Sequence, residues 1–273
     1  MNTHAATFRA LHERPGAFVM PNAWDGISAL LLQRAGFEAL GSSSLALAFA
    51  LGRHDGVAAV SRDVAIDHAR LLATLTGLPV NGDLEDGYGA NPEDCARTVE
   101  AAVAAGLAGL GIEDTTPDPA RPIHDFDLAV TRVRSAAAAS RGRIVLTGRT
   151  DNYLRGRPDL DDTIRRLTAF AEVGADVLFA PALPDLDAIC TVARAVAPKP
   201  LAVVIGPGTG PVPLAVLAEA GVKRVSLGGA LYRRAMAALV DSAEKLANGD
   251  LAAAVAGAIP TRDIDALLPS APS

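Results

Sequence analysis

A fourfold repeat of helix, glycine and apolar run is the feature that most constrains the fold of this chain. In each copy an alanine-rich segment ends at a glycine and passes directly into a short apolar run. The copies lie at 35–40, 105–110, 173–178 and 220–225. Glycine fits the left-handed conformation just past a helix end, so each copy predicts a helix, its cap and a buried strand. Further strands are expected at 17–20, 78–82, 143–147 and 200–205.

Eight strands that alternate with helices favour a (β/α)8 TIM barrel over an open doubly wound sheet. The length of 273 residues suits this fold, since such barrels fold as one unit of roughly 250 residues. Half of the residues are hydrophobic, so the chain can bury a large core. We expect a catalytic barrel domain over residues 1–248 and a helical tail over 249–273 that packs on a neighbouring subunit.

Charge and cysteine content argue against several classes of protein. The 25 basic and 31 acidic residues give a net charge of -6, and no long basic run suggests nucleic acid or an anionic membrane as partner. Cys95 and Cys190 lie in helix-like stretches, which indicates a reducing compartment. Neither a signal peptide nor a membrane-spanning stretch is visible, so we expect a cytoplasmic protein.

Carboxylates stand where expected strands end. Asp83 and Glu85 follow one strand and Glu113 follows the next. In a barrel these ends converge on one mouth, where barrel enzymes hold their active sites. Three carboxylates there would repel one another unless a cation or a proton lay between them, and carboxylate oxygens suit Mg²⁺ or Mn²⁺. The sequence predicts a metal site made of these three residues; the alternative is an acidic turn.

Arg149 ends the following strand. Its guanidinium stays charged and can bind an anionic substrate or stabilise a developing enolate. The alternative is a structural salt bridge to Glu113 or Asp151. Ser43 and Ser44, after the second strand, could donate hydrogen bonds to a substrate carboxylate or simply form a polar turn.

Two long segments interrupt the minimal barrel pattern, at 45–60 and 115–126. Long loops at the catalytic mouth are usually lids or substrate contacts, although plain exposed insertions are the alternative. The second segment carries His124, which we count among the candidate substrate contacts. A Schiff-base aldolase is excluded as a class, because Lys199 and Lys223 lie at the opposite end of the barrel from the mouth.

The motifs together resemble those of the isocitrate lyase and phosphoenolpyruvate mutase superfamily. The family's Asp-x-Asp-x-Gly-Tyr-Gly appears as residues 83–89, with Glu85 in place of the second aspartate. Its Ile-Glu-Asp appears as residues 112–114, and its Arg-Thr-Asp as residues 149–151. The resemblance covers the chain from Gly16 to about Leu246.

This resemblance implies roles for individual residues. Asp83 would be the direct Mg²⁺ ligand, with Glu85 and Glu113 holding water on the metal. Arg149, Asp55 and Glu113 would be the catalytic residues. The resemblance also implies substrate contacts from Trp24, Ser43 and Ser44.

The loop after Ile-Glu-Asp departs from the family pattern. The isocitrate and methylisocitrate lyases carry a catalytic cysteine there, and phosphoenolpyruvate mutase carries lysines and an asparagine, but residues 115–124 contain none of these. Those specific activities are therefore not expected. What remains is a Mg²⁺-dependent carbon–carbon lyase acting on a small 2-oxo or 2-hydroxy acid through a pyruvate-like enolate, either as an oxaloacetate-type decarboxylase or as a lyase of substituted malates.

Two other functions stay open from the sequence. One is carbon–phosphorus bond chemistry on a phosphonopyruvate-type substrate, and the other is an idle member that binds a ligand without turning it over. The chain is also expected to form a homotetramer, a dimer of dimers, with its C-terminal helix exchanged between subunits. The apolar residues behind this expectation are Leu231, Met236, Leu239, Val240, Leu251, Val255 and Ile259.

Overall fold

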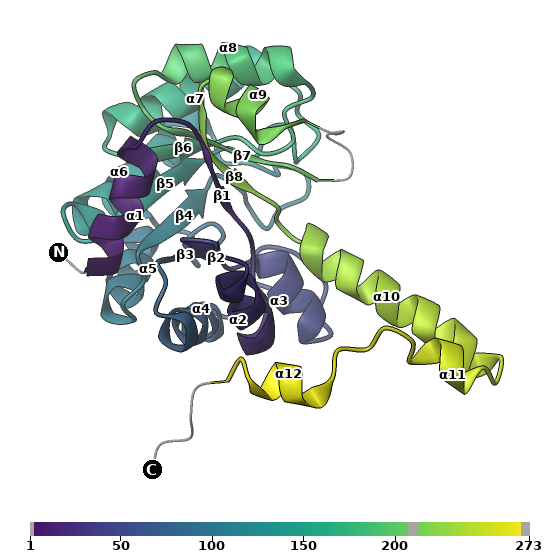
Figure 1. Cartoon of the computed structure of the whole chain (residues 1–273). Helices are drawn as coiled ribbons and strands as arrows, with labels where there is room; N and C mark the ends of the chain where they lie inside the picture. Colours follow the sequence, from purple (N-terminus) through teal and green to yellow (C-terminus); the bar gives the residue numbers. More distant parts are fainter. Residues whose placement is uncertain (1–2, 207–211, 269–273) are drawn as a thin grey trace.

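The computed structural model describes residues 3–206 and 212–268, and it confirms the (β/α)8 barrel (Figure 1). All neighbouring strands pair in parallel, in the order β1-β8-β7-β6-β5-β4-β3-β2. The strands are β1 Phe18–Met20, β2 Leu40–Gly41, β3 Val80–Asp83, β4 Gly109–Glu113, β5 Val145–Arg149, β6 Val177–Phe179, β7 Leu201–Val204 and β8 Val222–Ser226.

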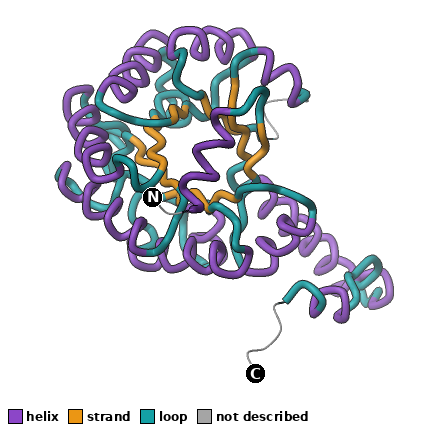
Figure 2. The backbone as a smooth tube through the Cα atoms, turned by 60° about the vertical axis from the view of Figure 1, so that its left-hand side comes forward, coloured by secondary structure: helices purple, strands orange, loops and turns teal. Residues whose placement is uncertain are grey.

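Helices surround the strands and cover their outer faces (Figure 2). Their bounds are α1 Thr3–Glu13, α2 Gly26–Arg34, α3 Ser44–Ala50, α4 Arg62–Thr76, α5 Pro92–Ala104, α6 Phe126–Ser140, α7 Leu160–Glu172, α8 Leu186–Val196, α9 Leu214–Glu219, α10 Ala230–Ala247, α11 Leu251–Ala254 and α12 Thr261–Asp265. In the described parts of the chain, none of these helices is both long and apolar enough to cross a bilayer.

The glycines of the repeat behave as the sequence predicts. Gly36, Gly106, Gly174 and Gly221 have φ angles of 89°, 79°, 114° and 92°. A side chain is strained in this left-handed region, whereas glycine is not, so each helix can end there and the chain can turn into the next strand.

A short bridge completes the barrel. The hydrogen-bonded order runs from β1 round to β2, and a parallel bridge between Asn22 and Gly41 joins these two ends. A Cβ atom on Gly41 would lie 2.8 Å from the Asn22 amide, so the closure requires glycine at this position. The Asn22 side chain also accepts hydrogen bonds from Leu227 and Gly228 just beyond β8, which ties the first and last strands together at the mouth.

The N-terminal helix closes the other end of the barrel, a feature that the sequence did not predict. In Figure 2, α1 lies across the centre of the ring of strands. Phe8 is fully buried there and packs with Phe18, Met20 and Val145 in a small core inside the strands. The interior of the barrel is therefore sealed at its base and open at the mouth.

The C-terminal helices leave the barrel. In Figures 1 and 2, α10 projects outwards from the ring of strands, with α11 at its far end, and Figure 1 shows that the chain then turns back through α12. Of the α10 side chains, Tyr232 at its base is buried, while Leu239 and Val240 are 61% and 56% exposed. The barrel thus ends near the base of α10, and the rest of this helix presents an apolar surface to its surroundings.

Candidate active site

A cavity of about 480 Å³ opens at the carboxyl ends of the strands. It brings together most of the residues that the sequence singled out, although they come from separate segments of the chain. The predicted residues that line it are Ser43, Ser44, Asp55, Asp83, Glu85, Glu113 and Arg149. The convergence follows from the parallel barrel, because every strand delivers its last residues to the same mouth.

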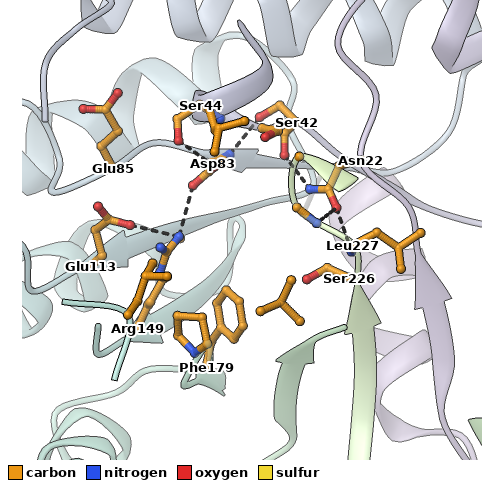
Figure 3. A pocket seen from close by; sticks show the side chains of 18 of the residues that line it. Asn22, Ser42, Ser44, Asp83, Glu85, Glu113, Arg149, Phe179, Ser226 and Leu227 are labelled. Atoms are coloured by element: carbon orange, nitrogen blue, oxygen red, sulfur yellow. Dashed lines mark hydrogen bonds and ion pairs between the residues drawn. The ribbon is translucent and has the colours of Figure 1, made fainter. Parts of the chain in front are cut away.

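Asp83 is held by the start of α3. Its Oδ2 accepts hydrogen bonds from the backbone N–H of Ser44 at 2.8 Å and from the Ser44 hydroxyl at 2.9 Å. The Ser42 hydroxyl accepts from the Asp83 backbone N–H at 2.8 Å (Figure 3). Ser43 caps α3 by accepting from the Ala46 N–H. Ser44, one of the two serines predicted to bind substrate, therefore also fixes the carboxylate that the sequence assigns to the metal.

Asp151 binds two nitrogens of the Arg149 guanidinium. The Nε and one terminal nitrogen of this guanidinium donate to the two oxygens of Asp151 at 2.6 and 2.8 Å. The other terminal nitrogen lies 2.9 Å from Glu113 and 3.5 Å from Asp83 (Figure 3). Arg149 therefore forms the salt bridges that were the alternative interpretation, and it also lines the cavity, as the substrate-binding interpretation requires. Asp151 occupies the bidentate edge of the guanidinium, so the terminal nitrogen that pairs with Glu113 is the one that could also contact a ligand.

Sequence reasoning named Asp151 as a possible partner of Arg149 but missed Asp114, the acid that holds this arrangement in place. Asp114, the last residue of Ile-Glu-Asp, is buried and accepts hydrogen bonds from the Thr150 hydroxyl and the Asp151 N–H. Arg166 of α7 approaches the same carboxylate at 3.1 Å. Asp114 therefore fixes the segment that carries Asp151, which in turn orients Arg149. The sequence did carry a signal for the pairing of Arg149 with Asp151, because the two residues are two positions apart in one motif.

The electrostatics of the mouth favour a cation. Burial raises the pKa of Glu113, and the charge of Arg149 only partly opposes this shift. Burial, together with the charges of Asp83, Asp86 and Asp55, raises the pKa of Glu85 to about 7 despite a hydrogen bond from Ala58. A divalent cation at this point would stabilise the charged forms of Glu85 and Glu113 against the effect of burial.

Glu85 lies apart from the other two carboxylates. In Figure 3 its carboxylate points away from Asp83 and Arg149. It accepts a hydrogen bond from the Ala58 N–H in the segment between α3 and α4. Residues two apart in a strand point to the same side, but Glu85 follows the end of β3 and has a φ of 49°, so this alternation does not hold for Asp83 and Glu85. The long segment at 45–60 therefore reaches the site, and it also brings Asp55 to the cavity.

No ready-made metal cluster is present among the described residues. Within 3–206 and 212–268, no three His, Cys, Asp or Glu side chains are grouped as a metal site would require. The three predicted ligands nevertheless line one cavity, and their oxygen donors suit a hard divalent cation that retains several waters. The donor chemistry fits such an ion, with Asp83 standing more open to the cavity than Glu113, their side chains being 24% and 7% exposed.

Trp24 and His124 are not among the residues that line this cavity. Trp24 packs edge-on against Tyr232 at the base of α10, with ring centroids 5.7 Å apart. His124 lines a second cavity of about 450 Å³ beside the 115–126 segment. Burial and the charges of Arg132 and Arg166 lower the pKa of His124 to about 4, so its ring is neutral at physiological pH. Their predicted contacts with substrate remain predictions.

The floor of the cavity holds a residue that the sequence did not single out. Arg224 of β8 is 2% exposed and lines the same cavity as Arg149. Ser226, two residues further along β8, lines it too, as expected for alternate residues of one strand. The alternation of side chains along β8 was therefore a sequence signal that Arg224 faces the barrel interior.

The chain matches the family model described as phosphoenolpyruvate phosphomutase over residues 8–247. Among solved structures, a Burkholderia cenocepacia J2315 protein described as a lyase/mutase superposes with a TM-score of 0.93. It is 45% identical, and the match covers 97% of this chain and 95% of that one. The structure of 2,3-dimethylmalate lyase superposes with a TM-score of 0.87 at 27% identity, covering 98% of this chain and 95% of that one.

A curated relative points to the same group of proteins. The oxaloacetate decarboxylase of Paraburkholderia xenovorans (strain LB400) is 32% identical over 259 residues, which cover 91% of this chain and 84% of the relative.

Proposed function

Because the chain belongs to the phosphoenolpyruvate phosphomutase family, we propose that it is a Mg²⁺-dependent carbon–carbon lyase acting on a small 2-oxo or 2-hydroxy acid through a pyruvate-like enolate. The observation that carries the proposal is the single cavity lined by Asp83, Glu85, Glu113 and Arg149. Relatives named 2-methylisocitrate lyase, oxaloacetate decarboxylase and 2,3-dimethylmalate lyase support carbon–carbon cleavage as the reaction class.

Three carboxylates would hold the cation. Asp83 would be its direct ligand, with Glu85 and Glu113 acting through water, because the open Asp83 carboxylate is already positioned by Ser44. Mn²⁺ offers the same preference for oxygen ligands and could replace Mg²⁺. When bound, the ion supplies a Lewis acid that polarises the carboxylate and 2-oxo oxygens of the acid.

Arg149 would stabilise the charge that develops on those oxygens. The terminal nitrogen that pairs with Glu113 would also face the substrate, and the two hydrogen bonds to Asp151 would keep the guanidinium in this orientation. A preorganised donor of this kind lowers the barrier without a cost of reorientation during the reaction. Asp55, whose pKa is raised by burial and by the charge of Asp83, would contribute a further acid from the 45–60 segment. Ser43 and Ser44 would bind the substrate carboxylate.

The test is a panel of 2-oxo and 2-hydroxy acids with Mg²⁺, in which pyruvate and inorganic phosphate are both measured. Pyruvate without phosphate is the expected result. Phosphate release would support the alternative carbon–phosphorus chemistry instead. Oxalate should bind only with Mg²⁺, since it mimics a planar enolate with two chelating oxygens. If oxalate binds in this way but no acid is turned over, the chain is an idle ligand-binding member.

The assembly and the location of the protein belong to the same proposal. We expect a barrel domain over 1–248 and a tail over 249–273 that packs on a neighbouring subunit, although residues 269–273 lie outside the described residues. The exposed apolar side chains of α10 and α11 support a homo-oligomer, for which we propose a tetramer. The cytoplasm remains the expected location.

A further inference from the structure

We propose that the floor of the barrel is a second anion-binding site, in which Arg224 takes a carboxylate group some way below the position of Arg149. This inference rests on the proposed function, which places one end of the bound acid at the mouth. It assigns Arg224 as the residue that binds a carboxylate at the other end of that acid.

Arg224 is a buried cation without an acidic partner. It is 2% exposed, and no ion pair joins it to any acid among the described residues. Burial is the cause that lowers its pKa to about 9, so the guanidinium remains protonated at neutral pH. Buried charges in proteins are normally paired, because an isolated charge in a dry interior costs several kcal/mol.

Within the described residues, the groups that contact Arg224 are neutral: the His12 ring, the Thr147 hydroxyl and the Phe8 ring, whose centroid lies 5.7 Å from the guanidinium carbon. One terminal nitrogen lies 3.3 Å from His12 Nε2, and the other donates to the Thr147 hydroxyl at 3.2 Å. His12 Nδ1 lies 2.8 Å from the Phe8 carbonyl, so it carries the proton, and Nε2 is left to accept from Arg224. Burial, with Arg224 next in importance, lowers the pKa of His12 to about 3. These contacts orient the guanidinium but leave its charge uncompensated.

The floor has room and further polar capacity for a ligand. Arg224, Thr147, Asn81 and Gly111 all line the cavity. A Cβ atom on Gly111 would meet nothing within 4 Å, so the barrel is hollow beside this strand. The Nε of Arg224, a hydrogen-bond donor, is buried and has no hydrogen-bond partner in the described structure. A packed barrel core would fill this layer with apolar side chains instead.

The depth of this site suits a small diacid. Thr147, which contacts Arg224, and Arg149 both line the cavity from β5 and are two residues apart, a rise of roughly 6.5 Å. The carboxyl carbons of an extended four-carbon diacid are about 4 Å apart, from C–C bonds of ~1.5 Å. Adding a charge-assisted hydrogen bond of about 2.8 Å at each end allows one molecule to reach both arginines.

The test compares ligands that differ only at their far end. Binding of malate and of 2-hydroxybutanoate, which share the 2-hydroxy acid group, is measured calorimetrically with Mg²⁺, and oxalate serves as a ligand of the upper site alone. We expect wild type to bind malate about 10- to 100-fold more tightly than 2-hydroxybutanoate. In Arg224→Gln this preference should disappear, while oxalate affinity stays within about 2-fold.

Matched variants keep the result interpretable. Arg224→Met has a similar length without charge and should behave like Arg224→Gln, while Arg234→Gln removes a charge from an exposed position on α10 and should retain the preference. A wild-type protein that binds oxalate with Mg²⁺ but does not prefer malate overturns the inference, even if neither Arg224 variant folds. An unchanged malate preference in a folded Arg224→Gln protein also overturns it.

Two further outcomes distinguish binding of a free acid from binding of a metal-bound acid, and distinguish a failure of this inference from a failure of the proposed function. Succinate binding in EDTA that is lost in Arg224→Gln would support the site as one for a free acid independent of the metal. A wild-type protein that binds no oxalate with Mg²⁺ contradicts the proposed function; the inference then stands or falls on that metal-free succinate measurement.

Discussion

At the residue scale, the site is a set of charges that hold one another in place. Arg149 contacts three acids, Asp83, Glu113 and Asp151. Although burial alone lowers the pKa of Arg149, the charges of Asp151, Glu113 and Asp83 outweigh it and raise this pKa. The guanidinium is therefore permanently charged, and changes to single members of the set should separate ligand binding from stability.

Asp83→Asn should lower Mg²⁺ affinity by at least about 100-fold and abolish turnover, because it removes the charged ligand of the proposed site. The fold should survive, since the amide oxygen of the substituted side chain could still accept from Ser44. Calorimetric titration with Mg²⁺ measures the effect. Asp67→Asn, which changes an exposed acid paired with Arg70, is the matched control. An Mg²⁺ affinity equal to that of wild type would remove Asp83 from the metal site.

Arg149→Lys should cost both activity and stability. Lysine cannot reproduce the two hydrogen bonds to Asp151, which is 0% exposed, so a buried carboxylate loses part of its compensation. We expect a loss of about 3 kcal/mol in the free energy of unfolding and about 100-fold in kcat. Urea unfolding and steady-state kinetics measure the two effects. Arg165→Lys, at an exposed ion pair with Asp162, should change neither. Reduced stability with a normal rate would limit Arg149 to a structural role.

At the scale of elements, α1 is the least anticipated part of the fold. It seals the barrel with Phe8 and places the neutral His12 ring against Arg224. The ring also packs edge-on against Phe8 and Phe18, with centroids 4.7 and 5.1 Å apart. A histidine in such a position titrates differently in the folded and unfolded chain, so the sealing helix should make stability depend on pH.

The pKa of His12 is about 3 in the folded protein against 6.5 ordinarily. As the pH falls below 6.5, His12 binds a proton in the unfolded chain but not in the folded chain. The contribution of His12 to the free energy of unfolding is therefore fully present above that pH and is lost progressively towards pH 3. At about pH 5 the loss from this residue should be about 2 kcal/mol. It is measured as the difference between wild type and His12→Gln in urea unfolding at about pH 7 and about pH 5. Equal pH dependence of the two proteins would contradict a neutral, buried His12.

At the scale of the whole molecule, the barrel is closed and the C-terminal helices are not covered. Leu239, Leu251, Val255 and Ile259 are 56–67% exposed. Such a run of apolar side chains on projecting helices is typical of an interface rather than of a monomer surface. Exchange of α10 between subunits would cover this surface.

Leu239→Asp combined with Val240→Asp should convert the expected tetramer into smaller species, because charges would be buried where apolar groups pack. Light scattering during size-exclusion chromatography measures the mass. Arg234→Asp changes the charge of the same helix at an exposed polar position and should preserve the assembly. A wild-type mass of 27.9 kDa, that of one chain, at micromolar concentration would rule out the exchange.

The sequence by itself determined the features that depend on short-range physics. Helix caps and apolar runs are local signals, so the repeat predicted the barrel, and strand ends placed Asp83, Glu113 and Arg149 at one mouth. The tertiary structure decided which charges pair. Asp151 binds the bidentate edge of Arg149, and the Ala58 N–H donates to Glu85. Among the described residues, Arg224 contacts neutral groups and no acid. The partner of a buried charge comes from distant segments, and its distance and burial, which set its energy, exist only after folding.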